Sequence, residues 1–483
     1  MTNNLLSAET VAAHNTRESC WIIVHGNVYD VTDFLDDHPG GSNIILKYAG
    51  KDATEEYDPI HPPNAIIDNL PKEKHLGKVE PGTIVKMAKE LTQEEIDREE
   101  RVKNRPPLSE ILNLHDFEAI AKEIMPPKAW AYYSSAADDE ITNRENHLAY
   151  QRIWFRPRVL RDVTHVDWST KILGHKTSMP IYITATALGK LGHPEGEVLL
   201  TRAAAKHGII QMIPTLASCS FDDIVNAAQP GQVQFMQLYV NKDRDITKRL
   251  VQHAEKRGIK GLFITVDAPQ LGRREKDMRM KFEGDADVQV GTAVDRSQGA
   301  ARAISSFIDP VPIILKGIQC WEDALMALEA KCDGIVLSNH GGRQLDMSRS
   351  GIEVLEEVVT KFKERGLWPC PKFEIYIDGG VRRATDVLKA VAMGATAVGI
   401  GRPFLYAYSA YGQDGINQAL QILKESFDEM EMNMRLLGAR TIEEVVPEMV
   451  DTRSLCSHSS PPANELYQSN YDKLRRAAIK SKL

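Results

Sequence analysis

Residues 108–450 predict an α/β fold, a (β/α)8 TIM barrel, and residues 1–80 predict a smaller α+β domain in front of it. Eight apolar runs of strand length recur along the larger region, and helical patterns such as 352–365 and 384–393 separate most of them. This alternation is typical of a parallel sheet with helical crossovers. An open doubly wound sheet is the alternative, and we favour the barrel because eight strands are counted and polar residues cluster where they end. The expected strands are 180–185, 208–213, 234–239, 261–267, 313–317, 334–339, 374–379 and 397–401.

Composition narrows the class of protein. Of 483 residues, 42% are hydrophobic and 26% are charged, which is typical of a globular protein in water. No apolar run is long enough to span a bilayer, and residues 1–10 resemble neither a signal peptide nor a transit peptide. The six cysteines are scattered without a C-x-x-C pair, which argues against a disulfide framework or a zinc site and fits a reducing compartment.

The net charge of −8 is concentrated near the N-terminus, since residues 1–80 hold six Lys or Arg and thirteen Asp or Glu. An acidic domain suits docking on a basic protein surface and argues against a nucleic-acid partner. Solubility alone explains the excess equally well.

A boundary between the two domains is predicted from a change in composition. Residues 91–104 are dense in charge and poor in large apolar side chains, and Arg-Pro-Pro at 105–107 follows them. This pattern indicates a linker with a short solvated helix. We expect a domain at 1–80, a linker at 81–107, the barrel at 108–450 and a C-terminal tail at 451–483.

The most informative stretch is Ser-Asn-His-Gly-Gly-Arg-Gln-Leu-Asp at 338–346, where an expected strand ends. His340 can take a proton near neutral pH, and the guanidinium of Arg343 can hold a carboxylate through two hydrogen bonds. Together they suit an enzyme that removes a proton from a small carboxylic acid. A surface turn with an incidental histidine is the alternative for this motif taken alone.

Glycine and arginine follow the last two expected strands. The sequence runs Asp-Gly-Gly-Val-Arg-Arg at 378–383 and Gly-Ile-Gly-Arg at 399–402. TIM barrels commonly bind phosphate with these two loops, where backbone N–H groups face the anion, and Arg382 and Arg402 would add charge-assisted bonds. The pattern therefore predicts a phosphate-bearing cofactor, with ordinary glycine turns as the alternative.

The motifs at 338–346, 378–383 and 401–405 resemble those of FMN-dependent 2-hydroxy-acid dehydrogenases and oxidases. Thr-Val-Asp-Ala-Pro at 265–269 and Ala-Trp-Ala-Tyr-Tyr-Ser-Ser at 129–135 agree with the same family. So do Gln237-Leu-Tyr and Leu271-Gly-Arg-Arg. The resemblance covers about 108–450.

The resemblance implies an acid–base group and its partners. His340 would take a proton from the substrate, and Asp267 would stabilise the imidazolium that forms. Tyr132 and Tyr239 would hydrogen-bond the substrate. The pair of His340 and Asp267 repeats the arrangement of a base held by an orienting group.

The resemblance also implies contacts to carboxylate and flavin. Arg274 and Arg343 would hold the carboxylate, and Lys316 would lie near the flavin and favour its reduced, anionic form. Further contacts to FMN are implied for Ala185, Thr186, Ala187, Gln237, Thr265, Ser338, Asp378, Gly379, Gly380, Arg382, Gly401 and Arg402.

The N-terminal domain carries a second cofactor signal. His38 opens a His-Pro-Gly-Gly motif, and His61 lies in Pro-Ile-His-Pro-Pro. Two imidazoles can bind haem iron from both sides, which leaves no open position and suits electron transfer. With Cys20-Trp21 and this spacing, residues 5–80 resemble a cytochrome b5-like domain that binds haem b, with His38 and His61 as ligands.

The two modules together resemble the flavocytochrome b2 family. The resemblance implies oxidation of a small L-2-hydroxy acid, with flavin electrons passing singly through the haem to an acceptor such as cytochrome c. Ala187 and Leu216 match members with small substrates, so L-lactate is favoured, and a homo-tetramer is expected. The alternatives are an oxidase that uses oxygen, with a vestigial haem domain, and a non-catalytic binding barrel.

Three features depart from the expected pattern. Pro214 stands where the family has a hydroxyl residue, and it can donate through neither side chain nor backbone. Between 268 and 312 no stretch of helical period follows Phe307, which predicts the loss of the fourth outer helix. The sequence ends Ser-Lys-Leu at 481–483, which predicts a peroxisomal location and its import receptor as a partner, with a cytoplasmic location as the alternative.

Overall fold

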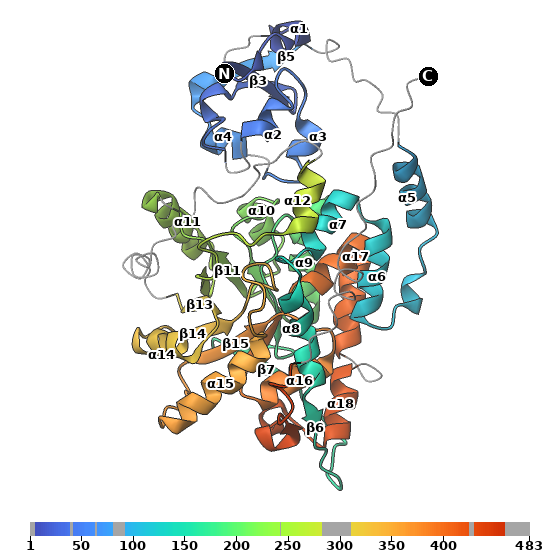
Figure 1. The fold of residues 1–483 in the computed structure, drawn as a ribbon, viewed down its shortest axis with the longest axis vertical. Helices are drawn as coiled ribbons and strands as arrows, with labels where there is room; N and C mark the ends of the chain where they lie inside the picture. Colours follow the sequence, from blue (N-terminus) through green and yellow to red (C-terminus); the bar gives the residue numbers. More distant parts are fainter. Residues whose placement is uncertain are drawn as a thin grey trace.

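The structure is a computed structural model that describes residues 5–38, 42–62, 65–80, 92–241, 243–282, 311–424 and 429–458. Figure 1 shows the N-terminal unit at one end of the molecule, above the barrel, with α7 and α12 drawn at that end. None of the helices within these ranges is long and apolar enough to cross a membrane.

The N-terminal unit is a five-stranded mixed sheet with short helices. Its strand order is β1-β5-β4-β3-β2, and β3 pairs antiparallel with β4. Cys20, Tyr29 and Leu35 are among the residues of a core between this sheet and the helices. The strands are β1 (Leu5–Leu6), β2 (Asn15–Thr16), β3 (Ser19–Val24), β4 (Asn27–Asp30) and β5 (His75–Val79). The helices are α1 (Ala8–Ala12), α2 (Ser42–Leu46), α3 (Thr54–Tyr57) and α4 (Ala65–Asn69).

Four helices precede the barrel. The first, α5 (Gln93–Lys103), begins with a capping box between Thr92 and Glu95, and none of its residues is buried, as expected for the charged segment. It contacts α6. The other three bury apolar faces against the barrel: α6 (Leu114–Ile124), α7 (Pro127–Ser134) and α8 (Ile141–Gln151).

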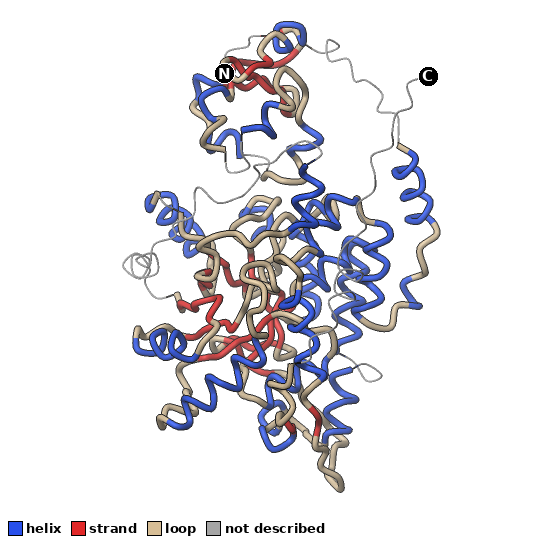
Figure 2. The backbone as a smooth tube through the Cα atoms, in the orientation of Figure 1, coloured by secondary structure: helices blue, strands red, loops and turns tan. Residues whose placement is uncertain are grey.

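Eight parallel strands close into a barrel, in the order β10-β11-β12-β13-β14-β15-β16-β9. All eight expected strands are confirmed. Figure 2 shows the strands gathered in the centre with helices outside them. The strands are β9 (Ile181–Ile183), β10 (Ile210–Ile213), β11 (Gln234–Leu238), β12 (Leu262–Thr265), β13 (Ile313–Ile318), β14 (Gly334–Leu337), β15 (Glu374–Asp378) and β16 (Ala397–Ile400).

Every strand contributes to the packed interior of the barrel. Large side chains such as Tyr182, Phe235, Phe263 and Tyr376 fill the inside of the barrel, which therefore has no pore. The outer helices bury their apolar faces against the strands. These helices are α9 (Glu197–His207), α10 (Phe221–Asn226), α11 (Arg244–Lys256), α14 (Trp321–Glu329), α15 (Gly351–Glu364), α16 (Ala384–Ala392), α17 (Arg402–Lys424) and α18 (Glu429–Leu437).

Short two-stranded sheets complete the barrel domain: β6 (Trp154–Phe155) with β17 (Val450–Asp451), and β7 (Thr170–Ile172) with β8 (His175–Thr177). Between β12 and β13 the structure has α12 (Glu275–Phe282), which packs on α7 and which the sequence did not predict. The predicted loss of the fourth outer helix concerns residues 283–310, which lie outside the described residues.

Candidate active site and haem-ligand site

The polar residues predicted at the strand ends lie at one mouth of the barrel. Thr265 ends β12, Lys316 lies in β13 beside it, and Asp378 ends β15. Ser338 directly follows β14. Because all eight strands are parallel, their carboxyl ends meet at this mouth, where TIM barrels build their sites.

His340 is held between an acidic and a phenolic group. Its Nδ1 lies 2.9 Å from Asp267 Oδ1, and its Nε2 lies 3.2 Å from the Tyr239 hydroxyl. His340 also has a positive φ of 59°, a strained backbone for a residue with a side chain. The loop thus turns the imidazole towards both partners, as the sequence predicted for a base and its orienting carboxylate.

The Asp267 carboxylate is buried and charged. Burial favours the neutral acid, but the charges of His340 and Lys316 outweigh this and lower the pKa of Asp267 below its usual value. Its Oδ1 pairs with His340, whereas its Oδ2 is buried without a hydrogen-bond partner in the described part of the chain. Burial and the Asp267 charge raise the pKa of Tyr239, so this phenol stays protonated at neutral pH.

Two arginines lie against the ring of Tyr132. The guanidinium carbons of Arg343 and Arg274 are 4.9 and 5.5 Å from the ring centroid. Burial and the nearby Arg274 charge lower the pKa of Arg343 to about 9, so it keeps its charge at neutral pH. Arg343 Nη1 donates to the carbonyls of Tyr132 and Ser135 at the end of α7, which fixes the guanidinium in place. Two cations that contact one aromatic ring suit an anionic ligand, and one of them, Arg274, is also paired with Asp277, with Nη2 and Oδ2 3.3 Å apart.

Lys316 joins the bases of three loops. Its Nζ lies 3.2 Å from both the Ser338 hydroxyl and Asp378 Oδ2. Burial favours the neutral amine, but the charges of Asp378 and Asp267 outweigh it and raise the pKa of Lys316 above its usual value. A fully charged ammonium is therefore fixed at the floor of the mouth.

The mouth fits a large polar cofactor such as a flavin. Thr184 Oγ1, Asp267 Oδ2 and Asp378 Oδ1 are buried without hydrogen-bond partners within the described residues, and such atoms cost free energy unless a ligand or water pairs them. Gln237 bridges two strands by donating to Thr265 Oγ1 at 2.9 Å and accepting from the amide of Thr215 at 3.1 Å. Ala185, Thr186 and Ala187 follow β9, and none of the three is fully buried.

The predicted phosphate loops are occupied by contacts within the chain. Arg382 forms an ion pair with Glu118 of α6, with Nη2 and Oε2 3.1 Å apart. The guanidinium of Arg402 donates to Asn143 Oδ1 and to the carbonyls of Tyr133, Ser135 and Gly341. Arg382, at the β15 loop, therefore has an ionic partner that a phosphate would have to replace, whereas the partners of Arg402 are neutral.

The glycine pair at 379–380 allows helix α8 to pack closely against the loop after β15. A Cβ on Gly380 would lie 1.9 Å from the Asn146 carbonyl oxygen, and Gly379 also faces the Asn146 side chain. Asn146 in turn exchanges two side-chain hydrogen bonds with Asn339, of 2.7 and 2.9 Å. This buried amide pair joins the loop after β15 to the loop that carries His340, and Gly401 packs separately against Thr184 and Thr186.

Sequence reasoning missed the residues that hold the loops. Glu197, 1% exposed, accepts hydrogen bonds from the amides of Gly189, Ser218 and Cys219, which fixes the loops that carry Ala187 and Leu216. No pattern in the sequence marks Glu197, since it lies within an ordinary amphipathic helix.

The two predicted haem ligands face each other in the N-terminal unit. The ring centroids of His38 and His61 are 6.0 Å apart, a spacing that leaves room for one metal ion between them. His61 stacks on Tyr57, whose carbonyl lies 3.2 Å from His61 Nδ1. Burial and the neighbouring His38 lower the pKa of His61 to about 4. A neutral imidazole whose Nδ1 is bound by a carbonyl presents Nε2 to a metal, so the pair fits haem iron.

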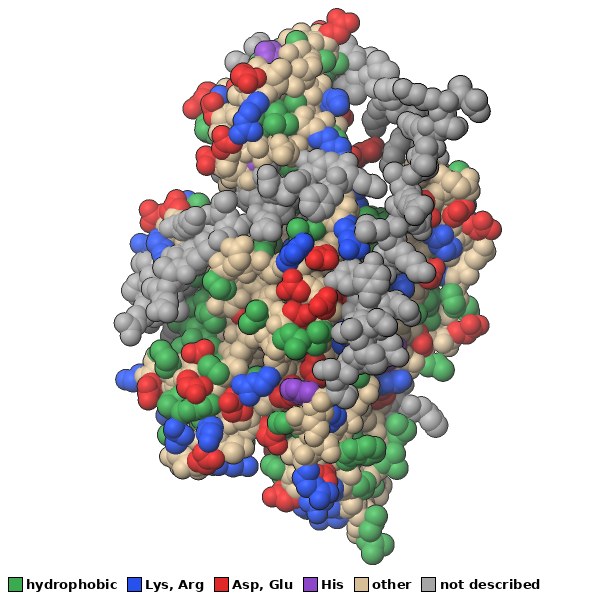
Figure 3. Space-filling view, in the orientation of Figure 1, with side chains coloured by type: hydrophobic (Ala, Val, Ile, Leu, Met, Phe, Trp, Pro, Cys, Tyr) green, Lys and Arg blue, Asp and Glu red, His purple; other side chains and the backbone are tan. Residues whose placement is uncertain are grey.

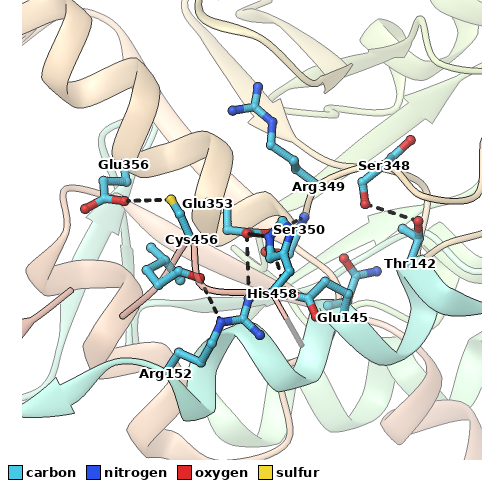
Figure 4. Close-up of polar contacts among 12 residues, drawn as sticks. Thr142, Glu145, Arg152, Ser348, Arg349, Ser350, Glu353, Glu356, Cys456 and His458 are labelled. Carbon is cyan, nitrogen blue, oxygen red and sulfur yellow. Dashed lines mark hydrogen bonds and ion pairs between the residues drawn. The ribbon is translucent and has the colours of Figure 1, made fainter. Parts of the chain in front are cut away.

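Figure 4 shows a further group of polar residues, where the chain after β17 contacts α8 and α15. Glu145, Glu353 and His458 present ligand atoms within 4.8 Å of one another. Arg152 forms ion pairs with both carboxylates. Because a cation already neutralises the group, we interpret it as an ion-pair network that fastens residues up to 458 to the barrel.

Figure 3 shows acidic and basic side chains interspersed over the visible face of the described residues.

Both the N-terminal unit and the barrel match models of known protein families. The family model described as FMN-dependent dehydrogenase matches residues 121–307 and 301–452. The model described as cytochrome b5-like heme/steroid binding domain matches residues 7–85.

Relatives match along the whole chain. An L-lactate dehydrogenase (cytochrome) from Wickerhamomyces anomalus is 56% identical over 98% of this chain and 85% of its own length. A solved structure of a double mutant of flavocytochrome b2 with pyruvate bound is 46% identical, with a TM-score of 0.73 over 81% of this chain and 100% of that one. A peroxisomal (S)-2-hydroxyacid oxidase from Arabidopsis thaliana is 43% identical over 73% of this chain and 99% of its own length.

The closed barrel, its mouth and the paired histidines define an FMN-dependent oxidoreductase fused to a haem-binding module. The chain belongs to the FMN-dependent dehydrogenase family and carries a cytochrome b5-like domain, like flavocytochrome b2.

The predicted peroxisomal location is wrong. The relative that matches 98% of the chain is a cytochrome-linked dehydrogenase, whereas the oxidase named as peroxisomal matches 73% at lower identity. The tripeptide 481–483 on which that prediction rested lies outside the described residues. A three-residue terminus is a weak signal beside similarity over the full length.

Proposed function

We propose that this protein oxidises L-lactate to pyruvate with FMN and passes the electrons through haem b to a one-electron acceptor of the cytochrome c type. The observation that carries the proposal is the arrangement of His340 between Asp267 and Tyr239, beside two arginines, in a chain that also holds a facing pair of histidines. The names of its full-length relatives support L-lactate as the substrate.

His340 takes a proton from the substrate at Nε2. Its Nδ1 faces the Asp267 carboxylate, which stabilises the imidazolium after transfer and holds the ring in one orientation. The Tyr239 hydroxyl lies at Nε2, where it donates a hydrogen bond to substrate oxygen or to the ring. The lowered pKa of Asp267 keeps it ionised, so it orients and stabilises the ring without competing for the proton.

Arg274 and Arg343 bind the carboxylate of the substrate. Both lie against the ring of Tyr132, whose hydroxyl adds a hydrogen bond to the substrate. Binding the carboxylate there places the neighbouring carbon of the substrate near His340. The free energy of binding is thereby used to orient the substrate.

FMN supplies a two-electron acceptor when it is bound, and haem supplies a one-electron carrier. Lys316, Gln237, Thr265 and Ser338 would hold the flavin ring, and Ala185, Thr186 and Ala187 would lie along its other side. Gly379, Gly380 and Arg382 would hold the phosphate side, together with Gly401 and Arg402, whereas the Asp378 carboxylate would accept hydrogen bonds from hydroxyl groups of the cofactor. The orphaned atoms of Thr184, Asp267 and Asp378 support a polar ligand in this place. His38 and His61 would bind the haem iron.

Domain boundaries and assembly complete the proposal. We propose a haem domain at 1–80, a linker at 81–107, a barrel at 108–450 and a tail at 451–483, which places α5 in the linker.

We propose a homo-tetramer, for which the exposed side chains of Leu160 and Leu436 offer apolar contact surface. Light scattering of the purified protein tests the assembly.

The decisive experiment follows both cofactors by their absorbance. The purified protein is mixed with L-lactate in the absence of oxygen, and flavin bleaching followed by haem reduction is expected. Flavin reduction without haem reduction would instead support an oxidase, which oxygen consumption would measure. A purified protein that contains no flavin would overturn the proposal.

A further inference from the structure

The loop after β12 and the loop after β14 approach each other more closely than side chains allow. These loops, 266–274 and 338–350, carry the proposed base, its carboxylate and both arginines. A Cβ on Gly272 would lie 2.4 Å from the carbonyl oxygens of both Arg343 and Gln344, so only glycine permits the approach.

The amide of Gln344 bridges the two loops. Its Nε2 donates to the carbonyl of Asp267 at 2.7 Å and to that of Gln270 at 3.2 Å. Its Oε1 accepts from the amide of Gly272 at 3.3 Å. One side chain therefore fixes three backbone positions of the neighbouring loop.

Those three positions lie directly beside the groups that the proposed function uses. Asp267 supplies the carboxylate that orients His340, and Arg274 follows Gly272 by two residues. Arg343 directly precedes Gln344 in the other loop. Since carbonyls at the end of α7 hold the Arg343 guanidinium, the Gln344 contacts bear mainly on the backbone that leads to Arg274 and so on its placement beside Arg343.

We propose that Gln344 is a positioning residue for carboxylate recognition: it holds Arg274 and Arg343 at the separation at which both bind one carboxylate. This inference rests on the proposed function. Gln344 acts through the two loops, since its amide is already committed to backbone groups. The His340–Asp267 bond joins two side chains and remains when Gln344 is replaced, whereas the backbone before Arg274 loses the bonds that hold it, so the loss of Gln344 should disturb the carboxylate contact more than the base.

The test compares two variants of the full-length holoprotein. Gln344→Met keeps the length of the side chain and removes all three hydrogen bonds. Ser348→Ala is the matched control, because the Ser348 hydroxyl bonds the Leu345 carbonyl at 2.8 Å within the same loop and joins it to no other described loop. Each is assayed with L-lactate and with its neutral methyl ester.

We expect kcat/KM of Gln344→Met to fall about tenfold for L-lactate, mainly through KM, and to stay within about twofold for the ester, since the ester does not use the paired guanidinium groups. Ser348→Ala should change neither by more than about twofold. An equal fall for acid and ester, or no fall for either, would overturn the proposal.

Two readouts do not depend on turnover. Hydrogen exchange in a peptide over 268–274 should be faster in Gln344→Met than in wild type and unchanged in Ser348→Ala. Calorimetry should find pyruvate bound about tenfold more weakly by Gln344→Met. If wild-type flavin is not reduced by L-lactate, the proposed function fails, while these two measurements still decide the role of Gln344. Unchanged exchange and unchanged pyruvate affinity would reject it.

Discussion

The haem-ligand site and the barrel site are built in opposite ways. Both haem histidines come from the segment between β4 and β5, within one small core. The barrel site draws on α7 and on residues after β11, β12 and β14, and its geometry exists only once the sheet has closed. A site built from one segment should keep its geometry when other parts of the chain change. The geometry of a site built from several loops depends on the conformation of each of those loops.

The sharpest way to separate the two sites is to remove the proposed base. His340→Gln should slow flavin reduction by L-lactate on the order of 10³-fold, since a positioned base contributes about 10²–10⁴-fold. The haem spectrum should not change, because no contact joins His340 to the described residues of the haem domain. Stopped-flow absorbance at the flavin band measures the rate, and nearly intact reduction would show that another group takes the proton.

The reverse experiment removes a haem ligand. His61→Ala should weaken haem binding by at least about 100-fold, since even the partners of metal ligands contribute about 10–100-fold. Flavin reduction by L-lactate should stay within about twofold. His25→Ala, at an exposed histidine that bonds Asp58, is the control and should keep its haem. Haem content is read from the Soret band, and full retention by His61→Ala would contradict the assignment.

Acid should weaken the barrel site through Asp267. The folded-state pKa of Asp267 is lowered, so its contribution to stability is present above the usual carboxyl pKa and is lost as pH falls through the lower folded value. Asp267→Asn should cost about 1–3 kcal/mol of unfolding free energy at pH 7. Its deficit against wild type should shrink below pH 4, as followed by denaturant unfolding. The exposed Glu443→Gln should track wild type throughout, and a deficit that stays constant with pH would exclude this origin.

The smallest effect concerns the phosphate side. Glu118→Gln removes the ionic partner of Arg382 and should strengthen FMN binding about twofold to fivefold, the range for a partly exposed ion pair. Flavin fluorescence quenching on titration of the apoprotein measures the affinity. Glu123→Gln, on the same helix, should leave it unchanged. Weaker binding in Glu118→Gln would mean that Glu118 positions Arg382 for the phosphate.

The contrast between the sites also explains what could be predicted. All eight strands were predicted because buried parallel strands such as β14 are continuous apolar runs. His340, Asp267 and Arg343 could be predicted as site residues because they lie in motifs directly after such strands. His38 and His61 could be predicted as haem ligands because both lie in short, distinctive motifs.

Residues that support the site gave no such signal. Glu197 lies within a helix, and its role depends on loops that only the closed barrel brings to it. Asn146 meets Asn339 across 193 positions of sequence. Gln344 lies within the motif at 338–346, but its hydrogen-bond partners in 267–272 belong to another loop. Their functions are tertiary, so composition and periodicity do not record them.

The amide pair of Asn146 and Asn339 has a thermodynamic consequence. It fastens one helix to the loop behind the proposed phosphate contacts and to the loop that carries His340. Linkage requires that the factor by which bound flavin changes the affinity for a hydroxy acid equals the factor by which a bound hydroxy acid changes the affinity for flavin. Any coupling that this amide pair transmits between the two ligands therefore has the same size whichever ligand binds first.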